Sequence, residues 1–152
     1  MNIEIYDSKR RKKLIEQLNE QFGITEIPKM IFLTGKERVR GFTGDLDINE
    51  LYLLDRITNL EFLGIYLFRP DENRSVRLGF DASIIFGKQI SKNIIELNEE
   101  QFNLWIRGNN LDLKIHKGMY VVCFGNDFLG CGVSDGERLI NFVPKERRIR
   151  KS

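Results

Sequence analysis

The amino-acid sequence predicts an α+β protein, in which an α/β N-terminal half (about residues 1–90) is followed by a small C-terminal β-barrel (residues 91–152). Before the boundary, apolar residues at helical spacing alternate with strand-like runs. In the last third of the chain, short strands follow one another through tight turns, a pattern typical of a closed or partly open barrel. The pattern changes at residues 87–93, where we place the boundary.

The N-terminal half begins with a predicted helix over residues 8–23. Ser8 is its expected cap, and Gly23 suits the position just after a helix. A second helix begins after Asp47, a capping residue, and its apolar residues Ile48, Leu51, Tyr52 and Ile57 lie close to one face. A hairpin is expected from strands at 30–33 and 38–42. The segment 60–68 is too apolar to alternate, so we expect a strand buried on both faces, followed by a returning strand at 76–80. Residues 81–90 are expected to form a short helix or turn.

The C-terminal half contains one predicted helix, over residues 99–108, capped by Asn98 and ended by Gly108. Its apolar residues Phe102, Trp105 and Ile106 are expected to face inward. We predict that Met119–Phe124 and Phe128–Val133 pair as antiparallel strands. The remaining strands are expected at residues 93–97, 111–115 and 139–143.

The two cysteines lie on the predicted hairpin. With a turn near Asn126, Cys123 faces about Leu129 and Cys131 faces about Val121, so the thiols are diagonal neighbours, too far apart for an unstrained bridge. Buried free thiols in a reducing, cytoplasmic setting are therefore favoured over a disulfide.

Several function classes lack their residues in this sequence. It contains no phosphate-binding Gly-x-x-x-x-Gly-Lys-Ser/Thr, no His-Glu-x-x-His and no Gly-x-Ser-x-Gly. Gly130, Gly132 and Gly136 have the wrong spacing for a dinucleotide fingerprint, and either relief of strain at a barrel bend or the close approach of another backbone explains them better. Two cysteines and one histidine argue against a zinc site. We therefore expect no cofactor, no metal and no catalytic residue.

Charge is segregated along the chain. The net charge is +2, yet residues 9–13 read KRRKK and five of the seven residues from Lys145 to Lys151 are basic, so the rest is net negative. A local positive patch of this kind binds phosphate backbones. A solvated helix start and a solubilising tail are the alternative. No apolar run approaches the roughly 20 residues that span a bilayer, so no membrane partner is expected.

The stretch from about Ile94 to Arg150 resembles a PUA domain, an RNA-binding module. The resemblance is carried by IRGNNL with Gly108, by the hairpin HKGMYVVCFGNDFLGCGV, and by the closing GERLINFVPKERRIR. With the preceding residues, the chain is similar to two-domain pre-PUA/PUA proteins such as archaeal and eukaryotic factors of large ribosomal subunit biogenesis. Its closing segment is similar to the PUA-like tails of Sun-family RNA cytosine methyltransferases, although these 152 residues contain no S-adenosylmethionine-binding motif.

The resemblance implies a non-catalytic RNA-binding protein that acts on structured ribosomal or transfer RNA during maturation or ribosome biogenesis. An alternative is a protein adaptor whose N-terminal half recruits an RNA-modifying enzyme or a pre-ribosomal factor. A weaker one is an RNA-modifying enzyme with unrecognised chemistry. The residues expected to bind RNA are basic; they are Lys145, Arg147, Arg148, Arg150 and Lys151 in the tail, Lys114, His116 and Lys117 in an exposed loop, and Arg107 and Arg138.

Overall fold

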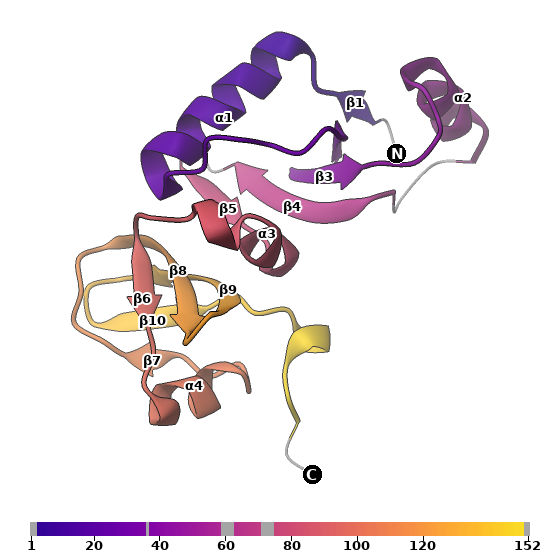
Figure 1. Cartoon of the computed structure of the whole chain (residues 1–152). Helices are drawn as coiled ribbons and strands as arrows, with labels where there is room; N and C mark the ends of the chain where they lie inside the picture. The colour runs from indigo at the N-terminus through magenta and orange to yellow at the C-terminus, as the bar shows by residue number, and fades with distance from the viewer. Residues whose placement is uncertain (1–2, 36, 59–62, 71–74, 151–152) are drawn as a thin grey trace.

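The computed structural model describes residues 3–35, 37–58, 63–70 and 75–150. Within them the chain forms two five-stranded sheets, in the orders β1-β2-β3-β4-β5 and β6-β8-β9-β10-β7. Figure 1 shows α3 between the two sheets, and the second sheet curls into a half-barrel, so the predicted α+β class is confirmed. The elements are β1 (Glu4–Ile5), α1 (Ser8–Phe22), β2 (Ile31–Gly35), β3 (Arg38–Phe42), α2 (Ile48–Thr58), β4 (Ile65–Pro70), β5 (Val76–Leu78), α3 (Phe80–Ile85), the 3-10 helix η1 (Gly87–Gln89), β6 (Ile94–Glu96), α4 (Glu99–Trp105), β7 (Leu111–Asp112), β8 (Gly118–Phe124), β9 (Asp127–Ser134), β10 (Arg138–Asn141) and the 3-10 helix η2 (Lys145–Arg147).

The first sheet is antiparallel throughout and contains the predicted hairpin, β2 with β3. The expectation that β4 is buried on both faces is only partly right. Its consecutive residues Leu67 and Phe68 are both buried in the core cluster that the sheet shares with α1, but Ile65 is 50% exposed and Arg69 is exposed as well. The part of the predicted strand at 60–62 lies outside the described residues.

Both helices of the N-terminal half form where predicted, with two corrections. The cap of α1 is Asp7 and not Ser8, because the Asp7 carboxylate accepts the backbone N–H of Arg10 at 2.8 Å. Helix α2 has the expected Asp47 cap, but of its predicted apolar face Leu51 alone is buried, whereas Ile57 is 71% exposed. Leu51 packs with Ile3 and Leu33, and the helix also accepts the N–H groups of Ile3 and Ile5 through the Asp55 carboxylate and the Tyr52 hydroxyl.

The largest core cluster crosses from one half of the chain to the other. It joins apolar residues of α1 and the first sheet to Val121 and Cys131 of the second sheet, with Phe86 among them. The division into domains at residue 90 stays a prediction. None of the described helices is long and apolar enough to cross a membrane.

The predicted hairpin of the second sheet is confirmed: β8 and β9 pair antiparallel, and both cysteines are free and buried. Cys131 lies opposite Val121, as expected. Cys123 lies opposite Phe128 instead of Leu129, because an irregularity between Val121 and Cys123 shifts the register. Helix α4 has the expected cap at Asn98, within a capping box, and Gly108 follows it with φ +90.

Candidate nucleic-acid interface

The tail after β10 is packed against the end of α4, and the buried Asn141 holds its first turn. The Asn141 amide donates to the carbonyl oxygens of Trp105 at 2.8 Å and Asn109 at 3.0 Å, and its side-chain oxygen accepts the N–H of Val143 at 2.7 Å. Further along, the N–H of Ile149 donates to the carbonyl oxygen of Ile106 at 2.8 Å. The tail is therefore docked at both ends of the segment 141–149, which fixes the path of its backbone.

Arg148 is half-buried and holds the tail in place. Its Nε donates to the carbonyl oxygen of Val143 at 2.9 Å, and its side chain lies over Gly108. A Cβ added at Gly108 would lie 2.5 Å from both Cδ and Nε of Arg148 and would displace that side chain, and the positive φ of +90 independently favours glycine there. We expected Arg148 to be a surface residue that the fold does not need; the structure gives it a structural contact.

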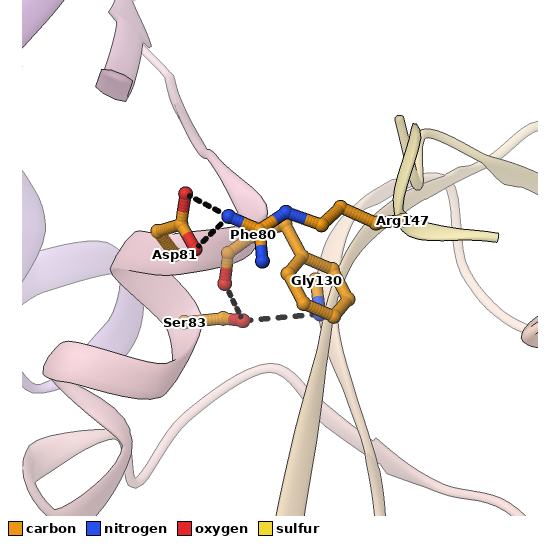
Figure 2. Close-up of polar contacts among 5 residues, drawn as sticks. All are labelled: Phe80, Asp81, Ser83, Gly130 and Arg147. Carbon is orange, nitrogen blue, oxygen red and sulfur yellow. Dashed lines mark hydrogen bonds and ion pairs between the residues drawn. The ribbon is translucent and has the colours of Figure 1, made fainter. Parts of the chain in front are cut away.

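Arg147 reaches from the tail to α3, as Figure 2 shows. Its Nη2 lies 2.9 Å and 3.1 Å from the two carboxylate oxygens of Asp81, and its guanidinium lies 5.7 Å from the centre of the Phe80 ring. The side chains of Arg147 and Asp81 are 49% and 34% exposed. A solvent-exposed pair of this kind is weak, so the guanidinium is held in position without being locked away from a phosphate.

Below this ion pair, α3 is joined to β9 through Ser83, a fully buried side chain (Figure 2). Its hydroxyl donates to the carbonyl oxygen of Phe80 at 2.7 Å and accepts the N–H of Gly130 at 3.0 Å. Gly130 has φ +79, and an added Cβ would lie 3.2 Å from the Phe80 ring. The expected close approach at this glycine is thus observed, and it fixes Phe80 beside the tail.

A pocket of about 420 Å³ opens beside Arg147, between α3, α4, the start of β9 and the tail. Flat apolar side chains form much of its wall, and Arg147 and Asp127 supply charge at its edge. A planar ring bearing hydrogen-bonding groups, such as a nucleobase, fits this chemistry. The wall residues are Phe80, Phe102, Phe128, Leu129 and Ile149.

The other predicted residues do not all join the tail. Lys114, His116 and Lys117 are exposed, and their loop is held by hydrogen bonds from the Tyr120 hydroxyl to the His116 carbonyl oxygen (2.9 Å) and from the Ser134 hydroxyl to that of Ile115 (3.1 Å). Lys117 lines a separate groove of about 720 Å³. The walls of this groove also include Gln17 and Gln21 of α1, and Asn93. The tail, by contrast, contacts α3 and α4.

Four more of the predicted residues are exposed: Lys145 and Arg150 in the tail, Arg107 after α4 and Arg138 at the start of β10. Lys151 lies outside the described residues. In the N-terminal cluster at 9–13, Arg11 is used structurally, since it donates to the carbonyl oxygens of Met30 at 2.6 Å and Pro28 at 3.1 Å.

Sequence reasoning missed Phe80, Asp81 and Ser83 as site residues: Phe80 was assigned to the returning strand at 76–80, and Asp81 and Ser83 to a short helix or turn. Their partners lie far along the chain: 66 positions separate Asp81 from Arg147, and 47 separate Ser83 from Gly130. The available signal was local and weak, namely a polar Asp and Ser within an otherwise apolar stretch.

Comparison with known proteins agrees with this geometry. Residues 92–149 match the family model described as the methyltransferase RsmF PUA domain, a span that runs from just before β6 to the docked tail. No curated protein sequence matches the chain. The C-terminal part is a PUA-like domain, as found in the tails of Sun-family methyltransferases, and a PUA domain indicates RNA binding.

Proposed function

We propose, on the premise that residues 92–149 form a PUA-like domain, that this protein binds structured RNA without catalysing a reaction, and that it acts in the maturation of ribosomal or transfer RNA. The observation that carries the proposal is the docked tail. It places Arg147 at the edge of an apolar pocket, with Lys145 and Arg150 exposed on either side in the sequence. Phosphates bind the cations, and an unpaired base enters the pocket.

The absence of catalysis is part of this proposal, and the cysteines support it. Burial raises the pKa of the Cys131 thiol to about 12. Burial also raises the pKa of Cys123, with the nearby Glu96 carboxylate acting in the same direction. Because the thiolate is the nucleophile, neither side chain is activated at neutral pH. The described residues contain no cluster of three or more His, Cys, Asp or Glu that could hold a metal ion.

The test is a titration of the protein with bulk transfer RNA at several salt concentrations. Removing one cation that binds a phosphate lowers the slope of log affinity against log salt by roughly 0.7–0.9. The Lys145→Ala/Arg150→Ala variant removes two exposed charges and should lower the slope by about one to two units. The Lys29→Ala/Arg56→Ala variant removes two exposed charges before β2 and on α2, and should keep the parent slope. Equal slopes for the parent and both variants would remove the tail from the interface.

A second candidate, a protein adaptor that recruits an RNA-modifying enzyme or pre-ribosomal factor, is favoured by the surface of α2. Large apolar side chains on this helix are exposed to solvent. Exposed apolar side chains that lie near one another on a surface mark sites where protein partners bind. An adaptor with only secondary RNA contact predicts weak binding and a shallow salt slope in the same titration. The exposed side chains are Ile48 (48%), Tyr52 (41%), Leu53 (55%) and Ile57 (71%).

A further inference from the structure

Four arginines share one face of the first sheet, and one of them contacts the start of the tail. Arg38 and Arg40 lie on β3, Arg69 on β4 and Arg77 on β5, and they surround Tyr66. The alternation along the strands explains the arrangement, because side chains next to each other in a strand point to opposite faces. The residues between and beside them, Val39, Phe68 and Leu78, are buried in the core that the first sheet shares with α1.

The strand register brings the four arginines together around Tyr66. Arg69 and Arg77 are direct partners across β4 and β5, and Arg40 is the partner of Tyr66 across β3 and β4. The guanidinium of Arg38 lies 5.2 Å from the centre of the Tyr66 ring. Burial, followed by the charge of Arg38, lowers the pKa of Arg40. Like charges on facing strands destabilise a sheet, so the stability of the fold does not by itself explain these four arginines.

The arginine face, as we call Arg38, Arg40, Arg69 and Arg77, adjoins the PUA-like domain. Arg77 lies over the ring of Phe142, just after β10, at 3.8 Å from its centre. The Nε of Arg77 is buried and has no hydrogen-bond partner within the described part of the chain. One carboxylate, Glu37, pairs with Arg69 at 3.2 Å, and its side chain is 78% exposed, so a stronger anion can displace it.

We propose that the arginine face is a second RNA-contacting surface, which binds phosphates of the RNA held by the PUA-like domain and stacks a base beside Tyr66. The inference rests on the proposed function and extends it to the first sheet. Arginine suits this role because its planar fork binds phosphate through two hydrogen bonds and stacks on rings.

The test uses the full chain and bulk transfer RNA. The Arg38→Gln/Arg69→Gln variant changes two exposed side chains and should lower the salt slope by about one to two units, whereas Arg38→Lys/Arg69→Lys should keep the slope and weaken the affinity several-fold. Lys29→Ala/Arg56→Ala is the control of equal charge. Ultraviolet cross-linking of the parent protein gives an independent readout: a peptide containing Tyr66 should carry RNA.

The outcomes separate this inference from the proposed function. In one outcome the parent binds RNA and the tail variant binds it more weakly, but the glutamine variant keeps the parent slope and cross-links occur only in residues 92–149. The arginine face is then not an RNA surface. If the parent shows no salt-dependent RNA binding at all, the proposed function fails first and this inference fails with it.

Discussion

Arg147 in the tail and Asp81 in α3 form an ion pair that joins the end of the PUA-like domain to the preceding half of the chain, with Nη2 2.9 Å from one carboxylate oxygen and 3.1 Å from the other. The pair has two consequences. It directs the Arg147 guanidinium toward the pocket edge. It also partly neutralises the positive charge of Arg147, which a phosphate would otherwise bind. A carboxylate at this position therefore competes with RNA.

Asp81→Asn is expected to strengthen RNA binding, because it removes the competing carboxylate and leaves Arg147 to the phosphate. The salt slope should become steeper by roughly 0.7–0.9, the value for one further phosphate contact. The measurement is the same titration, with Asp45→Asn, an exposed carboxylate before α2, as the control of equal charge. Weaker binding by Asp81→Asn would contradict this prediction and would mean that positioning of Arg147 by Asp81 outweighs the competition with phosphate.

Arg148→Ala is expected to destabilise the fold, although it lies within the basic cluster. It removes a hydrogen bond to the Val143 carbonyl oxygen and the packing over Gly108, which together lower the free energy of unfolding by about 1 kcal/mol. Arg150→Ala, at an exposed residue, should change it by less than about 0.5 kcal/mol. Urea unfolding of the two variants makes the comparison. Equal stabilities would show that the tail is not docked as described.

Ser83→Ala is expected to lower the free energy of unfolding by about 1–3 kcal/mol, because the buried N–H of Gly130 is left without its acceptor. Ser8→Ala is the matched control, since Asp7 supplies the cap of α1 and Ser8 is exposed. Thermal or urea unfolding measures both. A neutral Ser83→Ala would contradict the α3–β9 contact, and a destabilising Ser8→Ala would contradict the assignment of the cap.

Cys131 gives a prediction about pH. Burial raises the pKa of its thiol from 9.0 to about 12, so the folded state keeps the proton over a range in which the unfolded state loses it. The stability contributed by the protonated thiol is full below about pH 9 and is lost as pH rises toward 12. Unfolding in urea at about pH 7.5, 9.5 and 10.5 should show a steeper decline for the parent than for Cys131→Ala. Parallel declines would contradict the buried thiol.

Local signals in the sequence predicted the helices and strands, but contacts between distant parts of the chain could not be predicted from those signals. Capping residues such as Asn98 and Asp47, and the turn between β8 and β9, act over a few residues and are legible in the sequence. The register shift that sets Cys123 opposite Phe128 depends on how two strands pack, and no local pattern encodes it.

The candidate site divides in the same way. Basic residues in the tail were visible as a cluster, but the roles of Arg147 and Arg148 depend on Asp81 and Gly108, which meet them only in the folded chain. The arginine face did leave a signal: in RVR, at 38–40, charged residues alternate with a buried valine, as on a strand with one charged face.

The most direct test of the central claim, that the PUA-like domain holds RNA at its docked tail and pocket, is an amide chemical-shift map of the ¹⁵N-labelled protein with bulk transfer RNA. The account predicts that the largest shifts fall in residues 145–150 and at the turn around 125–128, which borders the pocket. Unchanged amide shifts throughout residues 92–149 at saturating transfer RNA would contradict it, and weak shifts overall would favour the adaptor.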